Sequence, residues 1–161
     1  MKSILVKDGY HLQDLIGENL KLHGNNCDLN HLDVSQVKDM SSIFLHSQFN
    51  GNISKWNVSN VVNMNDMFRH SIFNGDISKW DVSRVIDMNY MFRGTEFTGD
   101  LTQWTPYKLE HKIYMFFHCP ATPPYWSLAT DTLAAIKLKE LKDKLDEEMT
   151  HNQTCLNKIK I

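Results

Sequence analysis

The chain has 161 residues, of which 42% are hydrophobic and 22% charged, and its formal net charge is -2 at pH 7. This length fits about one domain, and the balanced composition argues against disorder, a membrane span or a general nucleic-acid-binding surface. The three cysteines, Cys27, Cys119 and Cys155, are odd in number and far apart, so we expect no disulfide framework.

The N-terminal residues carry no recognisable export signal. The apolar run of residues 4–6 is too short for the hydrophobic segment of a signal peptide, so we expect a cytoplasmic protein. Residues 4–31 are predicted to form an N-terminal cap with a short amphipathic helix that Gly24 ends. The apolar positions of this helix are Leu12, Leu15, Ile16, Leu20 and Leu22.

His23, Cys27 and His31 recur at a spacing of four residues, which would suit a metal ion bound on one helical face. The intervening residues 24–26, Gly-Asn-Asn, favour a turn instead. We therefore prefer surface or packing roles for these three side chains and predict no metal site.

Residues 73–92, FNGDISKWDVSRVIDMNYMF, repeat the sequence FNGNISKWNVSNVVNMNDMF found 24 residues earlier. Trp56, Trp80 and Trp104 mark the period, and Leu32 takes the same place one unit before them. Self-similarity at such a spacing is typical of repeat arrays. The predicted units are 32–55, 56–79 and 80–103, followed by a partial unit at 104–118.

The pattern inside one unit predicts its local structure. Apolar and polar residues alternate over residues 78–82, which indicates a short strand with Trp80 and Val82 on one face. Over residues 88–92 the apolar spacing changes to three and four, which indicates one or two helical turns. The Phe-Asn-Gly turn follows, and its glycine can adopt a positive φ at no steric cost; the glycines concerned are Gly51, Gly75 and Gly99.

A single unit of this kind cannot bury its own apolar face, so neighbouring units must stack. We therefore predict an α/β fold over residues 1–126: a short leucine-rich-repeat-like solenoid of stacked parallel short strands and short helical turns. Recurring methionines are read as core residues rather than a metal-binding cluster, and recurring serines as an internal hydroxyl ladder rather than nucleophiles.

The motif FNGDISKWDVSxVxxMxxMF resembles the repeat of bacterial BspA-type leucine-rich-repeat surface proteins, and GNNCDLNHLDVSQVKDMSSIF is similar to the entry unit of such arrays. The resemblance covers about residues 12–118. It implies a non-enzymatic binding scaffold, often on a cell surface and tied to adhesion or host contact, with no catalytic residues. The chain departs from that pattern in its few repeats and its charged C-terminal tail.

The C-terminal part of the sequence leaves the repeat. Pro106 lacks an N–H donor, so the strand ladder is expected to weaken or end there, and residues 119–126 are predicted to be a stiff linker. Residues 127–161 are predicted to contain an amphipathic helix with two alternative roles. It either packs on the solenoid end, or presents Leu138, Leu141 and Leu145 to a partner, including a second copy in a homodimer.

Function must be carried by the positions that vary between units. Tyr and Arg are enriched at protein-binding hot spots, and both gather in the second half of the array. The predicted partner-binding residues are Arg69, Tyr90, Arg93, Tyr114 and Phe117, together with Lys55, Lys79 and Asp81 on the exposed side of the expected strands. In the alternative interpretation, the terminal helix covers the tyrosines and Phe117.

His46, His70 and His118 share one position of the repeat, where Gly94 interrupts the column. Stacked units would bring His46 and His70 within about 5 Å, so protonation of both would be disfavoured and the surface could respond to pH. The alternative is that these are polar loop residues repeated with their unit.

We expect no enzyme activity and no cofactor, because no Ser-His-Asp or Cys-His set and no phosphate-binding glycine loop stands out. Asp76 and Asp100 belong to a repeated turn position rather than to a catalytic pair. The sequence thus predicts a scaffold that binds another protein, such as an intracellular inhibitor or adaptor of phage or effector type. The alternatives are a surface adhesin-like module and a self-associating unit.

Overall fold

The computed structural model describes residues 3–128. In chain order its elements are β1 (Ile4–Leu5), α1 (Gly9–His23), β2 (Leu32–Asp33) and the 3-10 helix η1 (Tyr125–Ser127). Strands β1 and β2 pair in parallel. The chain divides into two compact units, Met1–Pro124 and Tyr125–Ile161. The predicted C-terminal helix, with Leu138, Leu141 and Leu145, lies outside the described residues, as does Cys155.

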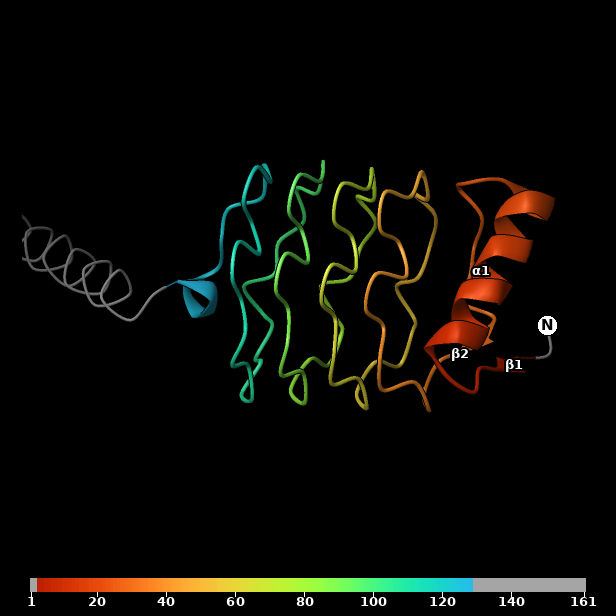
Figure 1. Ribbon diagram of the computed structural model, residues 1–161, viewed down its shortest axis with the longest axis horizontal. Helices are drawn as coiled ribbons and strands as arrows, with labels where there is room; N and C mark the ends of the chain where they lie inside the picture. Colours follow the sequence, from red (N-terminus) through yellow and green to blue (C-terminus); the bar gives the residue numbers. More distant parts are fainter. Residues whose placement is uncertain (1–2, 129–161) are drawn as a thin grey trace, which may run out of the picture. The chain divides into compact units, whose positions relative to one another are not determined.

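Helix α1 lies at one end of the first unit, next to the first repeat (Figure 1). Asp8 caps its N-terminus by accepting a hydrogen bond from the His11 N–H at 2.9 Å. Gly24 ends it with φ 79°, donating its N–H to the Leu20 carbonyl. The expected helix and its stop are therefore present, although Leu22 is 76% exposed rather than part of the buried face.

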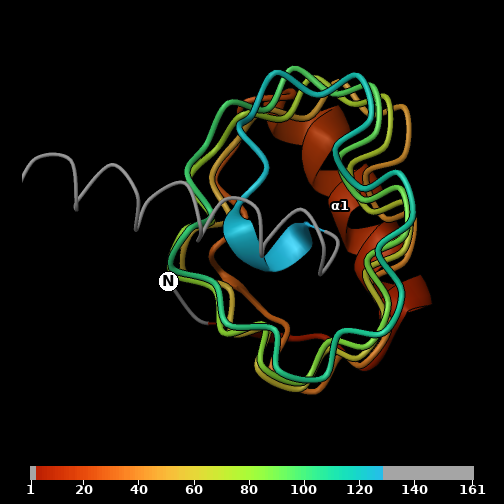
Figure 2. The ribbon, with the colours of Figure 1, turned by 90° about the vertical axis from the view of Figure 1, so that its left-hand side faces the viewer.

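The repeats lie side by side and follow nearly the same outline (Figure 1 and Figure 2). Backbone hydrogen bonds join neighbouring repeats, and one regular set of them runs from each repeat to the next. The N–H of Met64 donates to the Asp87 carbonyl at 2.8 Å, and that of Phe68 to the Met91 carbonyl at 3.0 Å. We call these N–H groups, spaced two residues apart, the donor row, and the carbonyls they reach the carbonyl row. The donors in the second unit are Met64, Asp66, Phe68 and His70.

Aromatic rings form columns inside the array. The Trp80 ring stacks between Trp56 at 6.4 Å and Trp104 at 6.5 Å, and its indole N–H donates to the buried Ile53 carbonyl. The two phenylalanine columns are Phe44, Phe68, Phe92 and Phe116, with neighbours 5.5 to 5.6 Å apart, and Phe49, Phe73 and Phe97. Stacked pairs of this kind add roughly 0.5–1.5 kcal/mol each beyond area burial.

The predicted fold class is wrong. Within residues 3–128 the structure is mostly coil and turn, with one α-helix and a single two-stranded sheet, so the leucine-rich-repeat-like solenoid of stacked strands and helical turns is absent. Between repeats the described residues show only isolated parallel bridges. These bridges pair Asp28 with Asn52, Asp39 with Asn63, Asn63 with Asp87, and Asp87 with His111.

Side chains explain why the expected strand at residues 78–82 does not form. Asp76 Oδ1 accepts the Ser78 N–H at 2.9 Å, and Asp81 Oδ1 accepts the Ser83 N–H at 3.0 Å. The Trp80 N–H then donates to the Ile77 carbonyl within its own unit. These local bonds compete with strand pairing and turn the chain on both sides of the tryptophan.

Left-handed residues explain why the expected helical turns do not form. Tyr90 has φ 57° and Gly94 has φ 66°, and a right-handed helix cannot contain them. The Phe92 N–H therefore donates to Met115 in the next unit instead of closing a helical turn. The equivalent residues of the other units also have positive φ. The equivalents of Tyr90 are Ser42, Asp66 and Tyr114, and those of Gly94 are His46, His70 and His118.

Pro106 does not end the bonding between units, contrary to expectation. It lies in a turn, where its carbonyl accepts the Leu109 N–H. The Glu110 N–H still donates to the Ile86 carbonyl at 3.0 Å, and the Met88 N–H to the His111 carbonyl at 2.8 Å. A missing N–H at position 106 therefore removes no bond between units.

The repeated glycines have a different role from the one expected. Positive φ among the described glycines occurs at Gly24 and Gly94, not at Gly51, Gly75 or Gly99. A Cβ on Gly75 would lie 2.8 Å from the Phe73 ring and 3.1 Å from the Gly51 carbonyl. These glycines are required because the backbone passes directly against the ring of the phenylalanine two residues earlier.

Replacing Gly75 by Ala should therefore destabilise the protein by about 1–3 kcal/mol, because the buried Phe73 ring must move. Gly17 is the matched control. It lies in α1, where an added Cβ meets nothing within 4 Å, so Gly17→Ala should stabilise by about 0.5–1 kcal/mol. Urea unfolding followed by tryptophan fluorescence measures both. Equal stabilities for the two variants would contradict the packing role of Gly75.

Asp76 should make stability depend on pH. The N–H and the hydroxyl of Ser78 donate to its carboxylate at 2.9 and 2.7 Å and hold the pKa of Asp76 below its ordinary value of 3.8. Because the folded pKa is lowered, this stabilisation is complete above 3.8 and is lost as the pH falls through the folded value. The pKa values of Asp33, Asp81 and Asp100 are lowered by similar bonds.

Asp76→Asn keeps an acceptor but does not titrate, and Asn52 already holds this position one unit earlier, accepting the Ser54 N–H at 3.1 Å. Between about pH 5 and pH 3, the Tm of the wild type should fall further than that of Asp76→Asn. Thermal unfolding at the two pH values makes the comparison. An identical fall in both proteins would show that the Asp76 turn adds no pH-dependent stability.

Candidate binding surface

Arg93 lies among three aromatic rings on the surface of the array. Its guanidinium carbon is 5.6 Å from the centre of the Tyr90 ring, 5.9 Å from Tyr114 and 5.5 Å from Phe117. All three distances fall within the range of cation–π attraction. With Arg69, these residues form what we call the arginine–aromatic patch.

Arg69 extends the patch into the preceding unit. Its guanidinium lies 5.6 Å from the Tyr90 ring and forms an ion pair with Asp66 at 3.1 Å. The Arg69 side chain is 33% exposed, so this ion pair contributes little stability and mainly orients the guanidinium. The buried Nε of Arg69 has no hydrogen-bond partner in the part of the chain described here.

The rings of the patch also contact one another. Tyr90 and Tyr114 stack at 6.1 Å, and Tyr114 meets Phe117 edge to face at 5.3 Å. Tyr114 is 59% exposed and Phe117 is 43% exposed, whereas Tyr90 is half-buried. The five predicted residues from the variable positions thus form one contiguous surface.

Lys55, Lys79 and Asp81 do not belong to that surface. They are exposed beside the tryptophan turns, and no interaction joins them to the patch within residues 3–128. The Lys55 N–H donates to Asn30, and Asp81 accepts from Ser83. The sequence correctly predicted that these three side chains are exposed. It did not show whether they lie near Arg69 and Arg93.

His46 and His70 stack at 5.1 Å with an angle of 10° between the rings, as the repeat spacing indicates. Burial lowers the pKa of His70, and the nearby His46, Arg69 and Arg93 lower it further, against the opposing effect of Asp66. A Cβ on Gly94 would collide with the His70 ring. Gly94 therefore provides both the left-handed backbone and the space that His70 occupies, a role that sequence reasoning missed.

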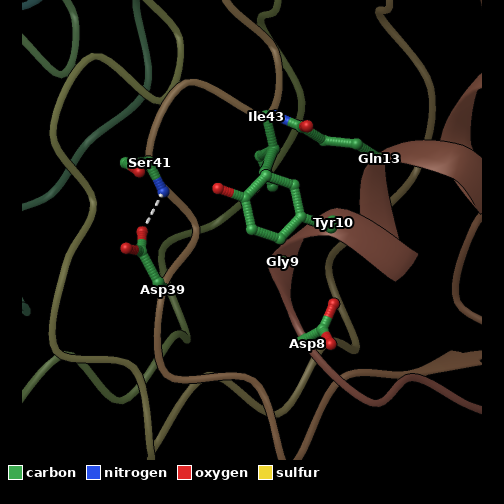
Figure 3. A pocket seen from close by; sticks show the side chains of 7 residues that line it. All are labelled: Asp8, Gly9, Tyr10, Gln13, Asp39, Ser41 and Ile43. Atoms are coloured by element: carbon green, nitrogen blue, oxygen red, sulfur yellow. Dashed lines mark hydrogen bonds between the residues drawn. The ribbon is translucent and has the colours of Figure 1, made fainter.

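Two pockets lie near α1. The first, of about 280 Å³, is open between the start of α1 and the first repeat (Figure 3). Both of its carboxylates are engaged, Asp8 with the His11 N–H and Asp39 with the Ser41 N–H at 2.8 Å. The lining residues are Asp8, Gly9, Tyr10, Gln13, Asp39, Ser41 and Ile43.

The second pocket, of about 340 Å³, brings together His23, Cys27 and His31 with Asn19 and Asp28. Burial raises the pKa of the Cys27 thiol, which disfavours the reactive thiolate. In the described residues, no group of three or more His, Cys, Asp or Glu side chains is arranged to hold a metal ion. In the same residues, no helix is long and apolar enough to cross a membrane.

Comparison with known protein families gives a match for this chain. The family described as "Mycoplasma protein of unknown function, DUF285" matches residues 13–124, which include most of α1 and all of the repeats. No curated protein and no solved structure matches the chain. The chain therefore belongs to this DUF285 family, which is related to BspA-like repeat proteins.

Proposed function

We propose that the chain is a non-enzymatic protein-binding module whose contact surface is the arginine–aromatic patch. The observation that carries this proposal is the position of Arg93 among Tyr90, Tyr114 and Phe117. Rings and guanidinium are already oriented by one another, so a partner would lose little side-chain entropy on binding them. Exposed Tyr and Arg in such clusters are the residue types that dominate binding energy.

The arrangement of the repeat supports the same proposal. Repeated Trp, Val, Met and Phe side chains are buried in the core. The position ten residues after the tryptophan varies instead, from Ser42 and Asp66 to Tyr90 and Tyr114. Because a left-handed backbone holds each of these side chains at the surface, their identity can change without repacking the core.

We propose that the repeat of this module is of the BspA type. Two cellular settings suit such a module. The module acts as an inhibitor or adaptor inside a cell, of phage or effector type, or as an adhesin-like part of a surface protein. The resemblance of the repeat motif to BspA-type surface proteins supports the surface setting. Self-association through Leu138, Leu141 and Leu145 is a separate proposal, tested by sedimentation with and without residues 127–161.

Affinity capture from cells of the source organism should depend on the patch. Changing Arg69, Tyr90, Arg93 and Tyr114 together to Ala should reduce the amount of captured partner at least about ten-fold, because hot-spot truncations cost more than about 1–2 kcal/mol each. Arg93→Lys should also weaken capture, since Lys keeps the charge but loses the planar group that stacks on the rings. Quantitative mass spectrometry of the captured protein gives the ratio.

The matched control is Tyr107→Ala, which removes a tyrosine that is 82% exposed and lies outside the patch. Its capture should equal that of the wild type, and circular dichroism should show that every variant folds. If the same partner is captured by the folded four-residue variant, the patch is not the binding surface.

A further inference from the structure

The last repeat, residues 104–118, ends the array with three donors, the N–H groups of Tyr114, Phe116 and His118, for which residues 3–128 provide no acceptor. In every earlier unit the donor row pairs with the next unit: Tyr90, Phe92 and Gly94 donate to carbonyls of the last repeat at 2.9 Å each. The corresponding N–H groups of Tyr114, Phe116 and His118 donate to nothing in the described part of the chain. We call this row the open edge.

The residues between these donors are already satisfied. The Phe117 N–H donates to the Tyr114 carbonyl at 3.1 Å, and the Cys119 N–H to the Phe116 carbonyl at 3.1 Å. Turn bonds of the same kind occur in the earlier units, so the last repeat keeps the shape that its predecessors use for pairing. The open edge is therefore already in the conformation that a further segment would need.

Side chains at the open edge are also less covered than those of the preceding unit. Phe92 is fully buried between Phe68 and Phe116, whereas Phe116 is only half-buried and stacks on Phe92. Tyr114 and His118 are exposed. Trp104, by contrast, is 1% exposed, so the end of the tryptophan column is covered. The uncovered part of this end is thus the stretch that carries the free donors.

The hydrogen-bond donors of the open edge determine which kind of segment can bind there. A row of donors requires a row of acceptors, which an extended segment offers as a carbonyl at every second residue. Between units of the array the paired stretches run parallel, so we expect the same direction here. Between units, this role is filled by the carbonyls 7, 9, 11 and 13 residues after each tryptophan. The phenylalanine 12 residues after the tryptophan stacks on its equivalent in the preceding unit, as Phe116 does on Phe92. An aromatic residue in the segment would therefore cover Phe116.

A second copy of the chain does not meet these requirements. Two open edges brought together would place donors against donors, which cannot hydrogen-bond. The opposite end of the array is occupied by α1, which lines the pocket beside Asp39, Ser41 and Ile43 (Figure 1 and Figure 3). The carbonyl row of a first unit is therefore not free to pair with the open edge of another copy.

We propose that the open edge binds an extended segment of a partner protein through the N–H groups of Tyr114, Phe116 and His118, with an aromatic side chain of that segment stacked on Phe116. This inference rests on the proposed function, because it names the kind of partner segment that a protein-binding module would take. The segment resembles the M-x-x-M-F stretch of the repeat, and it would run beside Tyr114 and Phe117 of the arginine–aromatic patch.

Hydrogen exchange measured by NMR on the full chain tests the proposal. The probe is a synthetic peptide with the sequence of residues 80–103, which contains the required carbonyls and Phe92. When nine-tenths of the protein is bound, exchange at Tyr114, Phe116 and His118 should slow about ten-fold. The amides of Tyr90, Phe92 and Gly94 are internal references, already bonded in the free protein, and should not change.

A peptide with the same residues in reverse order is the control, because it keeps the composition but loses the register. Phe116→Ala should weaken the protection by the forward peptide, and unchanged exchange at the reference amides shows that this variant folds. Three outcomes overturn the proposal: equal protection by both peptides, protection already present in the free protein at low concentration, or protection that rises with protein concentration. The last two would assign the edge to the chain itself or to a second copy.

The failure of this inference is distinguishable from the failure of the proposed function. If the four-residue patch variant loses its partner but the peptide leaves the three edge amides unprotected, the edge proposal fails and the patch proposal stands. If the forward peptide protects the edge while capture survives in the patch variant, the edge proposal stands and the patch assignment fails.

Discussion

The structure depends on one backbone arrangement, in which every second N–H over one stretch of each repeat, positions 88–94 in the third unit, donates to the next repeat. In an ordinary strand, successive N–H groups point to opposite neighbours, so those two residues apart point to the same neighbour. Here the donors at positions 88, 90, 92 and 94 keep that common direction, although Tyr90 and Gly94 have positive φ. The intervening N–H groups close turns within the unit, which gives the array regular bonding without regular strands.

The aromatic columns follow from this bonding. Hydrogen bonds of 2.8 to 3.0 Å between backbones fix the separation of neighbouring units, and rings at equivalent positions then lie 5.5 to 6.5 Å apart. Met64, Met67, Met88 and Met91, all fully buried, fill the remaining space. Burial of these side chains supplies the main stabilisation, while the directional bonds determine which side chains meet.

The sequence predicted the repeat period, the helix α1 and its end at Gly24, because each depends on apolar spacing or on one recognisable residue. It did not predict the local conformation of a repeat. The residues that form the Asp76–Ser78 and Asp81–Ser83 bonds have the alternating polar pattern of a strand in the sequence. A tyrosine at position 90 gives no sign of a left-handed backbone. The one available signal was Gly94, which replaces histidine in an otherwise repeated column.

The candidate surface was predictable to a similar extent. Variation between units identified the arginines and tyrosines, because a common spacing places equivalent positions side by side, and the cation–π contacts confirm that these residues meet. Spacing alone could not show that Lys55 and Lys79 lie outside the patch, since that depends on turns which the alternating pattern concealed. Nor could it show which N–H groups remain unpaired, because pairing depends on the direction of the bonds.

The direction of the backbone hydrogen bonds links the arginine–aromatic patch to the open edge. Tyr114 contributes its ring to the arginine–aromatic patch and its N–H to the open edge. A segment that paired with this N–H would run beside the Tyr114 ring and shield part of it from water, where the attraction of Arg93 for the ring is stronger than at an exposed site. Backbone pairing would then supply affinity that is independent of sequence, and the patch would supply the preference for one partner over another.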